Sequence, residues 1–302
     1  MVKGKTVFVK DWGSYLKVNK GMIECYVKKE LKWSISPVEV SAIVFLVSSS
    51  ISSEVIKLVN DYGIDLVFFE GNEPVARVIP AKYGGAIKLW LRQLKSWKKD
   101  RLTFAKEFIR GKIHNQSVLL RYYERKYGMA ELRESIYNLE RLKSEVLTVQ
   151  TVEEVMQKEA EGAKWYWKGI KQLVPPELGF EGRRKLNPKD PFNIALNIGY
   201  GMLRRSVWKA IVIVGLNPYL GFLHKMRSGR PSLVFDLMEE FRAPFVDRPL
   251  TGLAREYPKG IEDKKTIYSK LVDSIKEEEI FTQARRLVNA LDGEEYRPFL
   301  DK

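Results

Sequence analysis

The sequence contains a single cysteine, Cys25, in 302 residues. A lone thiol cannot form an internal disulfide, and it cannot supply the several thiolates of a structural zinc site or an iron–sulfur cluster. Histidine is nearly as scarce, since His114 and His224 are the only two. This argues against the zinc hydrolases that place two histidines on one helix. Any metal site must therefore depend mostly on carboxylates.

Long apolar runs are also missing. The longest stretches without polar side chains, residues 42–47 and 210–216, are far shorter than the ~20 residues that cross a bilayer. The first residues, Met1 to Lys5, lead directly into alternating apolar and polar positions, without the apolar core of a secretory signal. The sequence therefore predicts a cytoplasmic protein with no membrane-spanning segment.

Acidic residues are in the minority. The sequence has 52 Lys and Arg against 38 Asp and Glu, a net charge of +14. The excess is concentrated in residues 82–126, which hold 13 basic and 3 acidic residues. So one-sided a block indicates a polyanionic partner, with nucleic acid first and an anionic membrane surface second. The alternative is a solvated, lysine-rich helix face.

Residues 1–80 have the pattern of a β-rich region. Strands are expected over 5–10, 15–18, 22–27, 40–47, 65–69 and 75–79, where β-branched and aromatic residues alternate with polar ones or form short runs. Ser52 or Ser53 can cap a short helix that ends at Gly63. The region 1–84 is therefore predicted to be a small β-sandwich-like domain with one helix.

From residue 85 the apolar period becomes helical. Further helices are expected over 117–127, 130–146, 152–173, 193–214, 232–241 and 264–291. Four prolines and the basic triplet Arg183-Arg184-Lys185 predict a polar loop between the third and fourth of these helices. The predicted fold class is α+β, with the N-terminal β-sandwich-like domain followed by a larger all-α domain, 85–302.

The scarce residue His224 lies in a loop directly before a helix that Pro231 and Ser232 are expected to begin. Three acids of that helix follow at the i, i+3, i+4 spacing, and two arginines flank them: Asp236, Glu239, Glu240, Arg230 and Arg242. The spacing predicts that the three carboxylates share one face of the helix. Oxygen ligands with one imidazole suit Mg²⁺ or Mn²⁺, and the alternative is a salt-bridged surface helix.

The helix expected over 152–173 adds further acids, Glu159 and Glu161, beside the small residue Gly162. The aromatic run Trp165-Tyr166-Trp167 that follows is expected to pack in a core or interface, with base stacking as the alternative. Acids in a basic domain repel DNA unless a cation bridges them to phosphate. Such a combination is typical of metal-assisted phosphodiester chemistry.

Four segments, in this order along the chain, carry a resemblance to a known family. They are Glu161-Gly-Ala-Lys-Trp-Tyr-Trp167, Asp190-Pro-Phe-Asn-Ile-Ala-Leu-Asn-Ile-Gly-Tyr-Gly-Met-Leu203, Gly215-Leu-Asn-Pro-Tyr-Leu-Gly-Phe-Leu-His224 and Ser232-Leu-Val-Phe-Asp-Leu-Met-Glu-Glu-Phe-Arg242 with Asp247-Arg248. Weaker similarity extends to Ile64–Phe69, Lys112–Gln116 and Tyr296–Phe299. The chain resembles the CRISPR-associated integrase family Cas1 over nearly its whole length.

The resemblance implies an N-terminal β domain that forms a homodimer, a helical domain that binds Mg²⁺ or Mn²⁺, and a small protein partner, Cas2. Position by position, it places the metal ligands and catalytic residues at Glu161, His224 and Glu239. Asp236 is a supporting acid or an alternative ligand. Glu159 is rejected as the ligand because no glycine follows it.

The basic residues expected to bind DNA phosphates are Arg183, Arg184, Lys185, Arg230, Arg242, Lys95, Lys98 and Lys99. The resemblance implies a metal-dependent DNA integrase and endonuclease, which inserts new spacer DNA into a CRISPR array when a DNA 3′-OH attacks a phosphodiester. Two alternatives remain. One is an architectural nucleic-acid-binding protein without catalysis, and the other is a structure-selective repair nuclease.

Overall fold

The computed structural model describes residues 4–80 and 85–302. The chain divides into two compact units: unit 1 is formed by Met1–Lys95 and Trp208–Asn217, and unit 2 by Ser96–Val207 and Pro218–Lys302. The change from strands to helices at residue 85 does not coincide with the boundary between these units. The first turns of helix α2 (Gly85–Tyr127) and the end of helix α5 (Pro191–Ile213) belong with unit 1.

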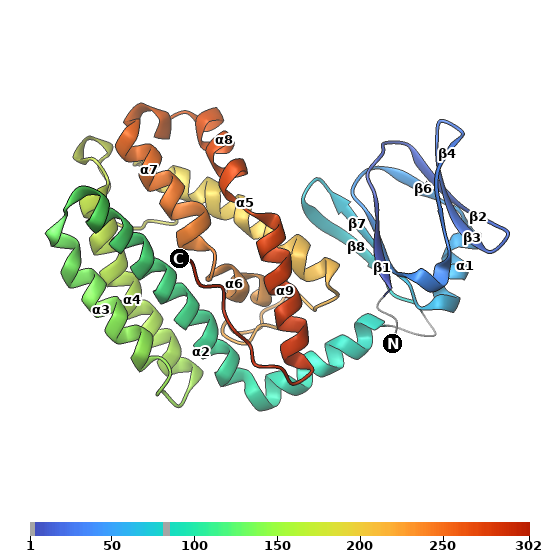
Figure 1. Cartoon of the computed structure of the whole chain (residues 1–302), viewed down its shortest axis with the longest axis horizontal. Coiled ribbons are helices and arrows are strands. Elements are labelled where there is room, and N and C mark those ends of the chain that lie inside the picture. The colour runs from blue at the N-terminus through green and yellow to red at the C-terminus, as the bar shows by residue number, and fades with distance from the viewer. Residues whose placement is uncertain (1–3, 81–84) are drawn as a thin grey trace. The chain divides into compact units, whose positions relative to one another are not determined.

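Unit 1 contains two four-stranded sheets (Figure 1). In the first, of order β1-β5-β7-β8, the parallel strands are β1 (Lys5–Val9), β5 (Val40–Phe45) and β7 (Asp65–Glu70), and β8 (Glu73–Val78) is antiparallel to β7. In the second, of order β4-β3-β2-β6, the antiparallel strands are β2 (Ser14–Asn19), β3 (Met22–Val27) and β4 (Glu30–Ile35), and β6 (Ser49–Ile51) is parallel to β2.

The apolar side chains of both sheets and of helix α1 (Ser53–Tyr62) form one buried cluster, to which Leu16, Ile43 and Val55 contribute. Ser52 caps α1 by accepting a hydrogen bond from the Val55 amide at 3.4 Å, and Gly63 ends it in the left-handed region at φ 68°, as predicted. The N-terminal strands and the helices that follow confirm the α+β class. The finer description of the first domain as a sandwich stays a prediction.

Two strands, β4 and β6, were not expected from the sequence. Every residue of β4 is exposed or half-buried, because β4 lies at the edge of its sheet. An edge strand carries little of the apolar alternation on which the prediction depends. Strand β6 has only three residues, and a 3₁₀ turn (Pro37–Glu39) precedes β5.

Helix α2 is a single helix of 43 residues. A separate helix over 117–127 is expected from the sequence, after the helical pattern that begins at residue 85, but the structure shows no break at the segment 110–117. That segment stays helical, and Lys112, Asn115, Gln116 and Ser117 are buried in it. Tertiary partners for these polar side chains therefore decide the continuity of the helix.

The remaining helices of unit 2 are α3 (Arg133–Glu145), α4 (Val152–Leu173), α6 (Ser232–Met238), a π-helical segment (Ala243–Asp247), α7 (Arg248–Glu256), α8 (Lys264–Ser274) and α9 (Glu277–Leu291). Three 3₁₀ turns lie between them, at Ala130–Leu132, Pro176–Leu178 and Pro258–Ile261. Helix α4 has the predicted bounds, which a capping box between Thr151 and Glu154 fixes at its start. Within the described ranges, no helix is both long and apolar enough to cross a bilayer.

The single helix expected over 264–291 is wrong, since α8 and α9 are separate helices. Ile275 and Lys276 between them are extended, with ψ of 100° and 91°. Glu277, Glu278 and Glu279 then occupy the first turn of α9, where negative charge interacts favourably with the helix dipole. The apolar period continues through the break, so periodicity alone could not locate it.

The C-terminal segment packs against α2 (Figure 1). The Asn115 amide donates to the Phe299 carbonyl at 2.9 Å, and the Asp301 amide donates to Asn115 Oδ1 at 2.8 Å. A Cβ at Gly111 would lie 2.7 Å from Pro298, so only glycine allows this approach. The tail supports the same stretch of α2 that faces the site described below.

Candidate functional site: a charged cavity in the helical unit

A cavity of ≈ 780 Å³ lies within unit 2. Helices α2, α4, α5 and α6, the loop before α5 and the loop before α6 all contribute to it. Its charged lining residues are Lys112, Glu159, Arg183, Lys185, Arg204, His224, Arg230, Glu239, Arg242 and Asp247. Acids and bases far apart in the sequence therefore share one water-accessible space.

The centre of this cavity is an ammonium group between two carboxylates. Lys112 Nζ from α2 contacts Glu159 of α4, and it lies 2.8 Å from Glu239 Oε2. The side chains of Lys112 and Glu239 are only 9% and 7% exposed. Burial alone would lower the pKa of Lys112, but Glu239 and Glu159 raise it above its usual value. The Lys112 ammonium therefore stays charged in spite of its burial.

Arg242 is the second cation on Glu239. Its Nη2 atom lies 2.9 Å from Glu239 Oε1, and its guanidinium stands 4.6 Å from the centre of the Tyr200 ring. Burial would raise the pKa of Glu239, but Arg242 and Lys112 hold it well below its usual range. The four charges of Lys112, Glu159, Glu239 and Arg242, here termed the cavity cluster, are balanced.

His224 reaches the same cavity through a backbone turn that Asp236 holds. The fully buried Asp236 carboxylate accepts hydrogen bonds from the amides of Phe222 (2.6 Å), Leu223 (2.9 Å) and His224 (3.0 Å). Asp236 Oδ1 also lies 2.7 Å from His224 Nδ1. This contact leaves the other ring nitrogen, Nε2, for a ligand.

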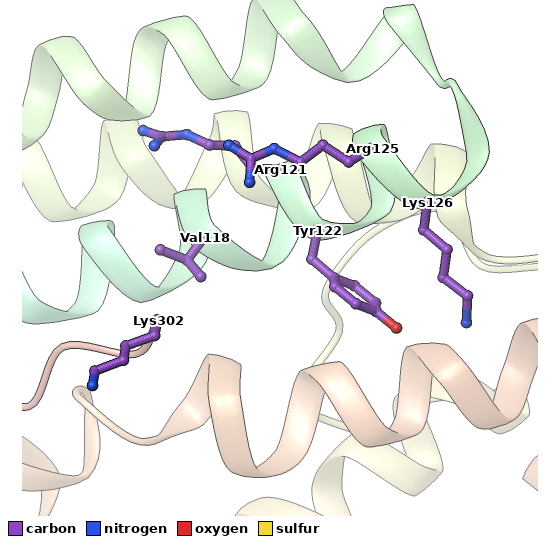
Figure 2. Close-up of a pocket in the computed structure, with 6 residues that line it drawn as sticks. All are labelled: Val118, Arg121, Tyr122, Arg125, Lys126 and Lys302. Atoms are coloured by element: carbon purple, nitrogen blue, oxygen red, sulfur yellow. The ribbon is translucent and has the colours of Figure 1, made fainter.

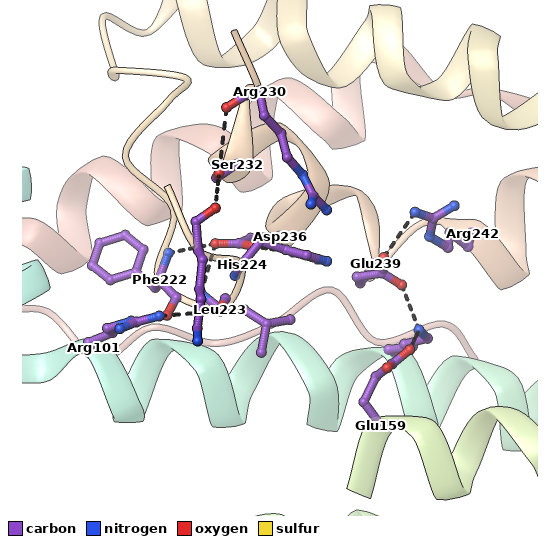
Figure 3. A network of polar contacts seen from close by, with 12 residues as sticks. Arg101, Glu159, Phe222, Leu223, His224, Arg230, Ser232, Asp236, Glu239 and Arg242 are labelled. Atoms are coloured by element: carbon purple, nitrogen blue, oxygen red, sulfur yellow. Dashed lines mark hydrogen bonds and ion pairs between the residues drawn. The ribbon is translucent and has the colours of Figure 1, made fainter. Parts of the chain in front are cut away.

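The turn before His224 is packed closely against the helix that carries Asp236. A Cβ at Gly221 would lie 2.6 Å from Asp236 Oδ2 and 2.8 Å from the Ser232 backbone. The Arg101 side chain of α2 donates to the Phe222 carbonyl at 2.7 Å (Figure 3). Both oxygens of Asp236 are thus engaged by the turn that they organise.

Asp247 is a buried carboxylate among the residues that line the cavity. Tyr166 donates to it at 2.7 Å and Tyr200 at 2.6 Å. Burial raises the pKa of Asp247 to about 6, and it raises the pKa of both tyrosines well above their usual value. Since Tyr200 packs under Arg242, this network positions Arg242.

The loop before α5 presents two of the predicted basic residues. Arg183 donates to Asn193 Oδ1 at 2.9 Å and to Asn197 Oδ1 at 2.6 Å, and Asn197 donates to the Lys185 carbonyl at 3.0 Å. Arg183 and Lys185 line the cavity. Across the described part of the chain, neither Lys185 nor Arg230 forms an ion pair, so both can bind phosphate.

Glu161 lies outside this cavity, although the resemblance made it a ligand. Its carboxylate is 2.7 Å from Arg141 Nη2 and 3.9 Å from Lys158 Nζ, and it is 38% exposed. Glu145 completes this group by contacting both bases at 2.6 Å. The structure thus does not bring Glu161 together with His224 and Glu239, whereas it does bring Glu159 there.

The geometry of helix α4 explains why Glu159, and not Glu161, lines the cavity. Residues two apart on an α-helix point about 200° away from each other. Glu159, Ala160 and Ala163 line the cavity. Glu161 must then point away from the cavity, towards Arg141 of α3. The lack of a following glycine therefore does not locate Glu159, since the face of α4 on which each glutamate lies decides which of them lines the cavity.

The three acids after His224 do not share one face either. Asp236 binds the turn before it, Glu239 enters the cavity, and Glu240 accepts hydrogen bonds at 2.6 Å from Tyr296 and from the Phe299 amide. Helix α6 ends at Met238, so the i, i+3, i+4 rule no longer applies to Glu239 and Glu240. Burial raises the pKa of Glu240 to about 8.

The remaining predicted basic residues divide into two groups. Arg230 and Arg242 line the cavity with Arg183 and Lys185. Arg184, Lys98 and Lys99 of unit 2 and Lys95 of unit 1 are not among the residues that line it. Lys112 and Arg204 line the cavity but were not selected from the sequence, although Lys112 begins one of the weakly similar segments; Trp167 of the aromatic run lines it as well.

A second depression, of ≈ 460 Å³, lies on the C-terminal half of α2 and contains no acid (Figure 2). Its lining residues are Val118, Arg121, Tyr122, Arg125, Lys126 and Lys302. Arg121 pairs with Glu140, and Lys126 lies 3.1 Å from Glu256. The depression can bind an anion, but it offers no group for bond-breaking chemistry.

The donors of the cavity fit a hard divalent cation in their chemistry. Two carboxylates already bind one cation, Lys112, and Glu239 Oε2 is buried without accepting a hydrogen bond of good geometry. Carboxylate, imidazole and thiol groups are not gathered in threes around one point anywhere in the described residues. A metal held by Glu159, Glu239 and His224 therefore requires these side chains to move closer together.

The comparisons with known proteins agree with this architecture. The family model of CRISPR associated protein Cas1 matches residues 7–266. A CRISPR-associated endonuclease Cas1 of Saccharolobus solfataricus is 62% identical over 301 residues, which cover 99% of this chain and 84% of that protein.

Two solved structures show the same fold. A casposase bound to its integration product has a TM-score of 0.80 at 21% identity, covering 98% of both chains. A chain of a partial Cas6-RT-Cas1–Cas2 complex has a TM-score of 0.71 at 16% identity, covering 99% of this chain and 100% of that chain. Taken with the family match and the close relative, they show that this chain belongs to the Cas1 family of CRISPR-associated proteins.

Proposed function

We propose that this protein is a metal-dependent DNA integrase and endonuclease, which joins the 3′-OH of incoming DNA to a phosphodiester of a CRISPR array. The observation that carries the proposal is the cavity cluster. Two carboxylates hold a cation inside a cavity otherwise ringed by arginine and lysine. Membership of the Cas1 family supports this function, and so does the similarity to an endonuclease and to a casposase.

Carboxylates have a clear purpose in such a cavity. Bare acids repel DNA phosphates, and they become compatible with DNA only when a cation lies between them and the phosphate. Glu159, Glu239 and His224 would hold Mg²⁺ or Mn²⁺, with His224 binding through Nε2 because Asp236 occupies Nδ1. A divalent ion bound there polarises a phosphodiester and lowers the pKa of an attacking oxygen.

The chain's own bases position the DNA. Arg183, Lys185 and Arg230 line the cavity and would bind non-bridging phosphate oxygens, and Arg183 is held in place by Asn193 and Asn197. These contacts carry no sequence information, so DNA affinity should fall steeply with salt concentration. Asp236 orients His224, and Asp247 orients Arg242 through Tyr200.

The proposed partners are double-stranded DNA, a second copy of this chain and Cas2. One structural neighbour comes from a Cas6-RT-Cas1–Cas2 complex, which supports a Cas2 partner here. Unit 1 is proposed to form the homodimer. Two cavities in one dimer would fit a reaction that joins two DNA ends to two strands.

The test is a Mn²⁺ titration of the joining of a short DNA duplex to a supercoiled plasmid. His224→Ala should abolish joining while leaving DNA binding within about twofold, because the imidazole contributes to the metal site and not to phosphate binding. His114→Ala is the matched control, since His114 lies outside the cavity with its Nε2 3.1 Å from the Asp301 carbonyl. Joining by His224→Ala at the wild-type rate would disprove the assignment.

An architectural nucleic-acid binder is the second candidate. One observation favours it: Lys112 and Arg242 already neutralise Glu159 and Glu239 without any metal. If neither cleavage nor joining occurs at any Mn²⁺ concentration while DNA still binds, this candidate replaces the first. A structure-selective repair nuclease would share the cavity, and it would prefer branched DNA to CRISPR-repeat DNA in the same assay.

A further inference from the structure

We propose that Lys112 is a built-in competitor for the divalent metal, which makes metal binding depend on DNA. The inference rests on the proposed function, because it concerns the same two carboxylates. The Lys112 ammonium lies between Glu159 and Glu239, in the position that a divalent ion would take. The metal must displace it to use both carboxylates.

The position of Lys112 is fixed by its burial and by the packing of its helix segment. The Lys112 side chain is 9% exposed, and the segment of α2 that carries it is held by Asn115, which donates to the Glu240 carbonyl at 2.7 Å. Gly111 beside it allows the C-terminal tail to pack there. Lys112 is therefore held in contact with both carboxylates, Glu159 and Glu239, and supplies a positive charge to the site.

The charge balance explains why DNA should matter. Glu159 and Glu239 carry two negative charges, and Lys112 and Arg242 carry two positive ones. A divalent ion added to this neutral group leaves an excess of two positive charges in a cavity that also contains arginine and lysine from the loops before α5 and α6. DNA phosphates remove this excess. Metal and DNA therefore each raise the affinity for the other by the same factor.

When a divalent metal binds, it displaces the Lys112 ammonium, whereas the Arg242 guanidinium keeps its position. Arg242 is held from two sides, by Glu239 at 2.9 Å and by the Tyr200 ring. Its planar guanidinium is also fixed in orientation, whereas a lysine ammonium is a point charge on a flexible stem. Once displaced, Lys112 stays in the cavity and can bind a phosphate oxygen.

The test measures Mn²⁺ binding directly, from the electron paramagnetic resonance signal of free Mn²⁺, with no turnover involved. Lys112→Met should bind Mn²⁺ at least about tenfold more tightly than wild type without DNA, because a positive charge within contact of both ligands is removed. A short DNA duplex should tighten Mn²⁺ binding by wild type, and it should do so much less in Lys112→Met.

Lys106→Met is the matched control. It removes the same charge from the same helix, and within residues 4–80 and 85–302 Lys106 donates only to the Leu147 carbonyl, at 2.9 Å. Its Mn²⁺ affinity should equal that of wild type. Lys112→Gln, which removes the charge but keeps a hydrogen-bond donor, should behave as Lys112→Met does.

Unchanged or weaker Mn²⁺ binding by both Lys112 variants would overturn the proposal. If Lys112→Met is unfolded in EDTA, added MnCl₂ must refold it, because metal then replaces the missing cation; failure to refold also overturns the proposal.

The proposed function fails in a different way. It fails if Glu159→Gln and Glu239→Gln leave Mn²⁺ binding and joining unchanged, whatever the Lys112 variants do.

Discussion

Helix α4 carries two glutamates, two residues apart, that belong to different charge clusters. Glu159, whose side chain is 29% exposed, belongs to the cavity cluster. Glu161 belongs to a surface cluster, formed with Arg141, Glu145 and Lys158. Both clusters contain two acids and two bases, but their exposure differs. Glu239 and Lys112 of the cavity cluster are 7% and 9% exposed, whereas Arg141 and Glu161 are 37% and 38% exposed.

The comparison shows that composition does not define a site. In the surface cluster, water screens each charge, so the ion pairs contribute little to stability and cannot hold an ion against solvent. In the cavity cluster, burial strengthens every interaction and makes an unpaired charge costly. Only acids that reach the cavity can act on a phosphate bound there, and the face of α4 decides which of its two glutamates reaches it.

The strongest contrast between the two clusters is expected in catalysis. Glu159→Gln should lower the rate of Mn²⁺-dependent joining by more than about a hundredfold. This is a larger loss than expected for a residue that only orients a metal ligand, because Glu159 is proposed to bind the metal itself. Glu161→Gln, the matched control on the same helix, should stay within about twofold. Rates of plasmid joining at saturating DNA measure both. The opposite pattern would restore Glu161 as the ligand and contradict the comparison.

The second difference is in stability. Arg242→Met leaves Glu239 without one of its two buried cations, so it should lower the free energy of unfolding by about 3–5 kcal/mol. Arg141→Met removes an equal charge from the surface cluster and should cost about 0.2–1 kcal/mol. Urea denaturation in EDTA measures both values. Equal losses would show that the two clusters do not differ in effective burial.

The third prediction concerns the support of His224. Asp236→Asn keeps the shape of the side chain but weakens the contact to His224 Nδ1, so joining should fall about tenfold to a hundredfold. The Mn²⁺ concentration for half-maximal joining should rise at the same time. DNA affinity should not change, which separates a loss of metal binding from a loss of phosphate contacts. An unchanged Mn²⁺ requirement would argue that Asp236 only stabilises the turn.

The weakest effect is expected at the buried acid in the wall of the cavity. Asp247 has a pKa of about 6 in the folded protein against a usual 3.8, so the folded chain holds its proton more tightly than the unfolded chain. Stability therefore falls as pH rises through this window. Asp247→Asn has no carboxyl to titrate, so it does not lose this stability. The difference in unfolding free energy, variant minus wild type, should therefore increase by on the order of 1–3 kcal/mol as the pH rises through the window.

Urea denaturation at intervals from about pH 4 to about pH 7 measures this difference. The informative quantity is the change in the gap between variant and wild type, and not the gap itself, since other groups titrate in both proteins. A gap that stays constant over the window would show that Asp247 titrates at its ordinary pKa.

Local signals in the sequence predicted much of the fold. Ser52 and Gly63 mark the ends of α1, and a capping box begins α4 at its predicted residue. Such signals act over a few residues, so a sequence displays them directly. Strand β4, the continuity of α2 through its polar segment and the break between α8 and α9 depend on neighbours distant in the sequence.

For the site, residue types and motifs were enough to predict the chemistry: scarce histidine, acids in a basic domain and the segments typical of the Cas1 family. They also selected His224 and Glu239, which the structure places in one cavity. The packing of the helices was needed to show that Glu159 enters that cavity, that Asp236 supports His224, and that Lys112 lies between the acids. The reason is physical. Residue type fixes what a group can bind, whereas burial and direction, which depend on how helices pack, fix what it does bind.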